Sequence, residues 1–113
     1  MYYTYMLRCS DNSIYTGITT DVTRRFAQHR GQIKGGAKYT GARVPVSIER
    51  VWESESRSDA SRLEYRIKKL SKADKERLIE QPEVLQDLMG EKLDVEPYRL
   101  LETGNGKSED LEI

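Results

Sequence analysis

The sequence contains a single cysteine and no long hydrophobic run, and both absences limit what the protein can be. Cys9, standing alone, excludes a disulfide-linked scaffold and a zinc site built from thiolates. No hydrophobic run approaches the ~18 residues that a membrane span requires. The first residues also lack the basic start and the apolar stretch of a secretory signal. We therefore expect no membrane association and a reducing, cytoplasmic location.

The charge of the chain is divided unevenly along its length. Of the 113 residues, 34% are charged and 36% hydrophobic, which is typical of one small domain with a charge-rich surface. Residues 1–80 carry 16 Lys and Arg against 10 Asp and Glu, whereas residues 81–113 carry 3 against 9. A basic body favours a polyanionic partner, because each neutralised phosphate releases counterions. An acidic end is typical of a solubilising or interaction segment.

The first half of the chain predicts three strands. Residues 2–9 are rich in aromatic and β-preferring types, and residues 13–18 form a second such run. The turn-forming residues 10–12 separate the two runs, so together they predict a β-hairpin. A third strand is expected at residues 46–53, after a proline.

Helices are expected on both sides of this third strand. The first covers residues 22–30, a longer one carries the apolar stripe from residue 60 to residue 70, and a third covers residues 72–80. A further helix is expected near residues 83–89. The predicted N-caps of the first three helices are Asp21 or Thr20, Ser58, and Ser71.

The order β-β-α-β-α-α predicts an α+β fold. We expect a small three-stranded antiparallel sheet, made of the hairpin plus the third strand and flanked by helices. Residues 1–80 would form this domain. Residues 81–113 would be an acidic C-terminal extension, with disorder from about residue 102, where the composition turns to Gly, Asn, Lys, Ser and acids.

Several polar residues could jointly handle a phosphodiester. By the two-residue period of a strand, Tyr15 and Gly17 share one face of the second strand, and Tyr5 belongs to the first. Arg25 and His29 are i,i+4 neighbours on the first helix. The fork of an arginine matches the oxygens of a phosphate.

Glu64 supplies a carboxylate beside the apolar stripe of the second long helix. One carboxylate can hold Mg²⁺ while the ion keeps several of its waters. Each of these residues also has a purely structural interpretation. Strand tyrosines commonly serve in packing, surface arginines are commonly solvated, and Glu64 with Lys68 is an ordinary i,i+4 ion pair. The spacing alone leaves both interpretations open.

Tyr5 followed ten residues later by Tyr15-Thr16-Gly17 resembles the paired signature of the GIY-YIG nuclease superfamily. The first element of that signature is reduced here to Tyr3-Thr4-Tyr5, as in small stand-alone bacterial members. The similarity extends in order over about residues 2–80. It includes the strand-to-helix passage at residues 15–29, the basic loop at residues 36–40 and the metal-binding helix at residues 60–64.

The resemblance implies a role for each matching residue. Tyr5 and Tyr15 would border the scissile phosphate and help to activate the attacking water. Arg25 would neutralise the charge that develops on the phosphoryl oxygens, with His29 as a further catalytic residue. Glu64 would hold one divalent ion, Mg²⁺ or Mn²⁺. The substrate-binding residues would be Gly17, Arg24, Lys38 and Tyr39.

We therefore expect a divalent-metal-dependent DNA endonuclease that acts in DNA repair or processing. The alternative is a nucleic-acid-binding protein that keeps the fold but cleaves weakly or not at all. A third possibility is a protein-interaction module whose acidic end docks on a basic partner. Residues 81–113 match nothing in the core of the family, and the sequence sets no oligomeric state.

Overall fold

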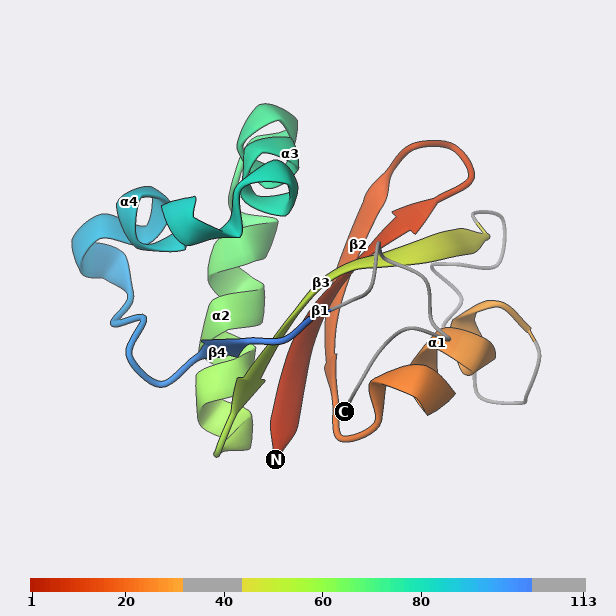
Figure 1. Ribbon diagram of the computed structural model, residues 1–113, viewed down its shortest axis with the longest axis horizontal. Helices are drawn as coiled ribbons and strands as arrows, with labels where there is room; N and C mark the ends of the chain where they lie inside the picture. Colours follow the sequence, from red (N-terminus) through yellow and green to blue (C-terminus); the bar gives the residue numbers. More distant parts are fainter. Residues whose placement is uncertain (32–43, 103–113) are drawn as a thin grey trace.

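One antiparallel sheet lies at the centre of the molecule, with helices packed on both of its faces. The computed structural model describes residues 1–31 and 44–102. Figure 1 shows α1 on one side of the sheet and α2, α3 and α4 on the other. The strands are β1 (Tyr2–Cys9), β2 (Ile14–Thr19), β3 (Pro45–Ser54) and β4 (Arg99–Leu100), in the spatial order β2-β1-β3-β4.

The β1–β2 hairpin sets the register on which the candidate site depends. Its turn contains Asn12 with a positive φ of 68°, and the Asp11 carboxylate accepts a hydrogen bond from the Ser13 N–H at 3.0 Å. In the resulting register Tyr5 lies opposite Gly17, and Leu7 lies opposite Tyr15. Directly opposed residues share a face of the sheet.

The helices are capped by polar side chains close to where the sequence predicts. The Asp21 carboxylate accepts from the Arg24 N–H at 3.0 Å, and the Ser71 hydroxyl accepts from the Asp74 N–H at 3.1 Å. The helices are α1 (Val22–His29), α2 (Arg57–Lys68), α3 (Lys72–Glu80) and α4 (Leu85–Met89), with short 3₁₀ turns at Pro82–Val84 and Gly90–Lys92.

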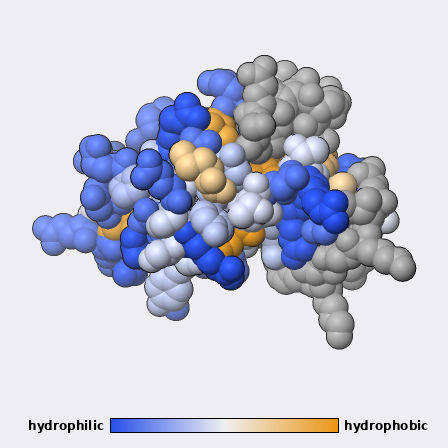
Figure 2. Space-filling model, turned by 90° about the horizontal axis from the view of Figure 1, so that it is seen from below, coloured by the Kyte–Doolittle hydropathy of each residue, from blue (hydrophilic) through white to orange (hydrophobic). Residues whose placement is uncertain are grey.

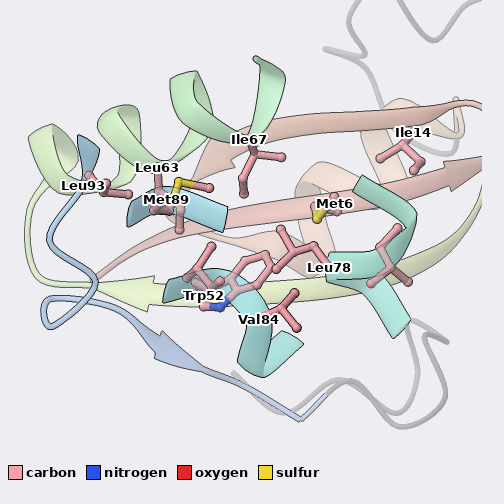
Figure 3. Close-up of a cluster of buried hydrophobic side chains, with 11 residues drawn as sticks. Met6, Ile14, Trp52, Leu63, Ile67, Leu78, Val84, Met89 and Leu93 are labelled. Atoms are coloured by element: carbon pink, nitrogen blue, oxygen red, sulfur yellow. The ribbon is translucent and has the colours of Figure 1, made fainter. Parts of the chain in front are cut away.

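The larger buried cluster lies between the sheet and helices α2 to α4 (Figure 3). Met6 of β1 and Leu63 of α2 are completely buried, and Trp52 of β3 packs with them. Residues after the expected boundary at 80 share this core with those that precede it. They contribute Val84, Leu85, Met89 and Leu93.

A second cluster lies on the other face, under α1. Tyr3, Tyr5 and Leu7 point from β1 to this side and meet Val22 and Phe26 of α1. Burial of the apolar stripe of α1 therefore holds the helix over the half of the sheet that carries Tyr5. Within the described residues, no helix is both long and apolar enough to cross a membrane.

The α+β prediction with a hairpin, a third strand and flanking helices is confirmed, but the sheet formed by the described residues has four strands rather than three. The additional strand, β4, pairs Leu100 with Trp52 and Arg99 with Glu53. Two residues are too few to show any alternation in sequence, so β4 could not be recognised from its pattern.

The predicted cap of the longer helix, Ser58, is wrong. The Ser56 hydroxyl accepts from the Asp59 N–H at 3.0 Å and starts α2 two residues earlier, while the Ser58 hydroxyl accepts from Arg62 at 2.7 Å. The helix expected near residues 83–89 is present as a 3₁₀ turn followed by α4. The disorder expected from about residue 102 concerns residues 103–113, which lie outside the described residues.

Candidate active site

The site is built around the side chain of Tyr5, which β1 holds between the sheet and α1. Only 2% of Tyr5 is exposed. Its hydroxyl lies 3.1 Å from Nε2 of His29, the last residue of α1, and the two groups form a buried hydrogen bond. The contact joins residues 24 positions apart, so it depends on the packing of α1 against the hairpin.

Tyr15 of β2 extends this pair toward the surface. Its ring meets the His29 ring edge-on at 4.8 Å between centroids and lies 6.2 Å from the Tyr5 ring. Tyr15 is only half-buried. The three rings therefore form a compact group, and part of the Tyr15 side chain is open to solvent.

Gly17 allows Tyr5 to approach the backbone of β2. A Cβ atom at position 17 would lie 2.5 Å from the Tyr5 hydroxyl oxygen and 2.8 Å from Cζ of that ring. No ordinary side-chain contact is that short, so any residue larger than glycine would displace the Tyr5 ring. Glycine is required here by the close approach of the ring.

Gly17→Ala is therefore expected to destabilise the protein by roughly 1–3 kcal/mol and to separate Tyr5 from His29. Chemical denaturation measures the first effect, and a change in the NMR signals of the His29 ring reports the second. In a Tyr5→Leu background the added methyl group meets neither the hydroxyl nor Cζ, so the same substitution should then cost less stability. An equal cost in both backgrounds would contradict this explanation.

Burial controls the protonation of the Tyr5–His29 pair. Burial, and secondly the positive charge of Arg25, lowers the pKa of His29 from 6.5 to about 4. Burial also raises the pKa of the Tyr5 hydroxyl above its ordinary value. Both groups are therefore neutral at pH 7, and a neutral imidazole has one ring nitrogen that accepts a hydrogen bond.

The stability of the protein should fall between pH 6.5 and pH 4 because of His29. The unfolded chain binds a proton near pH 6.5, whereas the folded chain resists it until about pH 4, so acid favours unfolding within this window. The expected loss is up to roughly 3 kcal/mol in the free energy of unfolding. Urea unfolding at pH 7, 5.5 and 4 measures it, and the loss should be absent from His29→Gln.

Glu76 titrates at lower pH than His29, so the contributions of the two groups to stability can be measured separately. The hydrogen bonds from Arg8, together with Lys72, lower the pKa of Glu76 from 4.5 to about 2. Its contribution to stability is therefore complete above pH 4.5 and is lost as the pH falls toward 2. If the free energy of unfolding of His29→Gln falls between pH 6.5 and 4.5 as steeply as that of the wild type, the assignment to His29 is wrong.

Arg25 brings a positive charge to this group of rings from α1. Its Nη1 donates to Oε1 of Gln28 at 2.9 Å, which holds the half-buried guanidinium in place. Its charge acts on both neighbours, because it lowers the pKa of His29 and opposes the rise in that of Tyr5. The guanidinium therefore lies near enough to serve an anion bound beside Tyr5.

Glu64 approaches from the other side of β2. Its Oε2 pairs with Nζ of Lys68 at 3.2 Å, and 24% of the Glu64 side chain is exposed. After burial and Tyr15, its negative charge is one of the factors that raise the pKa of Tyr5, so the carboxylate acts on the same site.

The donor set around Glu64 suits a hard divalent ion. Within residues 1–31 and 44–102, no three His, Cys, Asp or Glu side chains are grouped to hold a metal. A zinc site would need such a group. Mg²⁺ is commonly held by one or two carboxylates together with waters and substrate phosphate oxygens, and Glu64 matches that requirement.

The structure thus brings together most of the residues that the sequence singled out. Tyr5, Tyr15, Gly17, Arg25 and His29 come from β1, β2 and α1, and Glu64 joins them electrostatically from α2.

Arg24 is exposed, and no described contact connects its side chain to these residues. Lys38 and Tyr39 lie outside the described residues. Gln28 was missed, although its i,i+3 spacing from Arg25 is a signal of side-chain pairing on a helix.

The chain is similar in sequence to several known proteins. A UPF0213 protein of Halobacterium salinarum is 50% identical over 78 residues, which are 69% of this chain and 99% of that protein. The UPF0213 protein YhbQ of Salmonella arizonae is 43% identical over 88 residues, which are 78% of this chain and 86% of that protein. A UPF0213 protein of Bacillus halodurans, solved by solution NMR, is 40% identical. The match covers 80% of this chain and 96% of that one, with a TM-score of 0.47.

Among protein families, residues 1–77 match the GIY-YIG catalytic domain. The matched range contains Tyr5 of β1, Tyr15 and Gly17 of β2, helix α1 and Glu64 of α2. This is more than half of the chain, and it contains every described residue assigned to the site. The chain belongs to the GIY-YIG catalytic domain family, a nuclease superfamily.

Proposed function

We propose that the protein is a Mg²⁺- or Mn²⁺-dependent endonuclease that hydrolyses phosphodiester bonds of DNA in repair or processing, in the cytoplasm. The observation that carries this proposal is the grouping of Tyr5, His29 and Arg25 over Gly17, with Glu64 acting on the same hydroxyl. These groups can orient a water, neutralise a phosphate and hold a divalent ion. Each of these three contributions lowers the barrier to phosphodiester hydrolysis.

Arg25 would stabilise the transition state. As water attacks phosphorus, negative charge accumulates on the phosphoryl oxygens, and a guanidinium presents two parallel N–H donors to such oxygens. The hydrogen bond from Arg25 to Gln28 holds the fork before the substrate arrives. Groups positioned in advance lose no free energy to reorganisation during the reaction.

Tyr5 would orient the attacking water rather than remove its proton. A buried hydroxyl with a raised pKa stays protonated at neutral pH, so it is a poor base. When its hydrogen is directed to Nε2 of His29, its lone pairs remain available to accept a hydrogen bond from water. The half-buried Tyr15 would contact the same water from the solvent side.

Glu64 would supply the protein ligand of the metal. A divalent ion bound there would stabilise the charge of the leaving oxygen. Lys68, which pairs with this carboxylate, has to move away for the ion to bind. The Lys68 side chain is long and 53% exposed, so this movement is sterically free.

The polar surface favours a charged partner over an apolar protein partner. Figure 2 shows a mainly hydrophilic face with small, separate hydrophobic areas. A docking site for an apolar partner would present a larger continuous patch. The large hydrophobic side chains that are exposed among the described residues come from four separate segments: Met1, Val44 with Val46, Tyr65, and Leu100.

A nuclease assay tests the proposal. Single-stranded, duplex, flap and branched DNA are each incubated with the protein in Mg²⁺, Mn²⁺ or EDTA. Glu64→Gln, purified in parallel, controls for contaminating nucleases. Cleavage that requires the ion and is absent from the variant is the expected result, and no cleavage of any substrate by the wild type would refute the proposal.

The same assay addresses the second candidate, a nucleic-acid-binding protein that does not cleave. The ion pair between Lys68 and Glu64 favours this candidate, because it neutralises the carboxylate that a metal would need. Salt-sensitive binding of DNA without cleavage in either ion would support it.

A further inference from the structure

A row of charged residues on α2 faces the edge strand β2. Arg57, Glu64 and Lys68 are separated by seven and four residues, which are close to two turns and one turn of a helix. They therefore lie on one side of α2, with the carboxylate between the two cations. Residues of β2 lie alongside, and β2 has no further strand on its outer side within the described sheet.

Two hollows lie between these elements, one toward each end. The lining of the first includes Ile18 and Thr19 of β2, Arg25 of α1 and Arg57 of α2. The second is lined by Ile14, Tyr15, Thr16, Lys68 and, from α3, Lys75. We call the two hollows together the β2–α2 groove.

The charges of the β2–α2 groove have a simple pattern. Each hollow is lined by two cationic residues, and no Asp or Glu of the described residues lines either one. Thr19 lines the first hollow and Tyr15 lines the second. The two residues are four positions apart on β2, which corresponds to about 13 Å along a strand. Two pairs of cations at this separation suit a polyanion that runs along β2.

The centre of the groove coincides with the candidate active site. Gly17 lies between Tyr15 and Thr19 on β2, and Tyr5 lies opposite Gly17 in the hairpin register. Glu64 lies between Arg57 and Lys68 on α2. Phosphates bound in the two hollows would therefore lie on either side of a phosphate bound beside Tyr5.

We propose that the β2–α2 groove binds one continuous polynucleotide strand, whose phosphates on the two sides of the cleaved bond contact Arg57 at one end and Lys68 with Lys75 at the other. The inference rests on the proposed function, because that function places the cleaved bond beside Tyr5. It also defines the substrate class. An internal phosphodiester with nucleotides on both sides fills the groove, whereas a mononucleotide ester fills only its centre.

Arg57 and Lys75 are the residues to change, because Lys68 also pairs with Glu64. Ser56 caps α2, so the helix start does not depend on the Arg57 side chain. Lys92 lies on the 3₁₀ turn after α4, outside both hollows, and provides a matched control for the loss of one positive charge.

The first arm measures affinity for a short DNA duplex against salt concentration in EDTA, so that no cleavage is needed. Each phosphate contact contributes about 0.9 to the slope of log affinity against log salt. Arg57→Ala and Lys75→Ala should each reduce the slope by about that amount, and the double variant by about twice as much. Lys92→Ala should leave it unchanged, and Arg57→Lys and Lys75→Arg should retain it.

The second arm places one uncharged methylphosphonate at successive positions of the cleaved strand. Wild-type binding should weaken at two positions, one on each side of the cleaved bond. Arg57→Ala should abolish the sensitivity at one position, and Lys75→Ala should abolish it at the other. If both variants lose their sensitivity to the methylphosphonate on the same side of the cleaved bond, the inference is overturned.

The outcomes separate the inference from the proposed function. If Arg57→Ala and Lys75→Ala reduce the salt slope as expected but the wild-type protein never cleaves DNA, the proposed function is refuted and the groove remains a binding site. Wild-type protein that cleaves, with the slopes of Arg57→Ala and Lys75→Ala equal to that of Lys92→Ala, would refute the groove alone.

Discussion

Replacing Arg25 by alanine is expected to reduce metal-dependent cleavage by roughly 10²–10³-fold, the usual effect of removing one group that stabilises a developing oxyanion. The guanidinium is held by Gln28 and lies near both Tyr5 and His29. Arg25→Lys should restore only part of the loss, because an ammonium group carries the charge without the two-pronged geometry. Single-turnover cleavage rates measure both effects.

Two further measurements make the Arg25 result specific. Arg30→Ala removes the same charge from the exposed residue that caps the end of α1, and it should leave the rate nearly unchanged. Because the charge of Arg25 lowers the pKa of His29, Arg25→Ala should also raise that pKa, which NMR titration detects without any substrate. Cleavage at the wild-type rate by Arg25→Ala would show that this residue does not act on the phosphate.

Glu64→Gln is expected to abolish cleavage while leaving the protein folded and able to bind DNA. Glutamine keeps the shape and the hydrogen-bonding capacity of the side chain but removes the charge that Mg²⁺ requires. Affinity for DNA measured without metal should persist or rise, because one negative charge facing the phosphates has been removed. The paired measurement is therefore cleavage with metal and binding in EDTA.

The alternative for Glu64 is an ordinary ion pair with Lys68 on the surface of α2. That role predicts a loss of at most about 0.5 kcal/mol of stability and an unchanged cleavage rate. Glu80→Gln makes the same chemical change at an exposed position of α3 and should leave cleavage intact. Normal cleavage by Glu64→Gln would eliminate Glu64 as the metal ligand.

Local features of the sequence predicted most of the secondary structure. The Asp21 and Ser71 caps are visible in sequence because a cap bonds to an N–H only three residues away. The cap of α2 is Ser56 and not the expected Ser58; helix-forming residues follow both serines, and only the backbone geometry distinguishes them. β4 escaped detection because its two residues are ordered by pairing with β3, far away in the chain.

The candidate site divides in the same way. Periodicity alone places Tyr15 and Gly17 on one strand face and Arg25 and His29 on one helix face, because each pair lies within one element. The hydrogen bond between Tyr5 and His29 depends instead on how α1 packs against the hairpin.

Residues and spacing alone determined the hairpin, the helices after it, the basic body and the signature of the family. The tertiary structure decided that His29 is buried and neutral, that Gly17 must lack a side chain, and that α2 lies alongside β2. The reason is that burial, close approach and charge proximity are properties of surfaces brought together by packing. Short-range patterns specify each element, whereas contacts between elements arise only when the apolar faces of α1 and α2 cover opposite sides of the sheet.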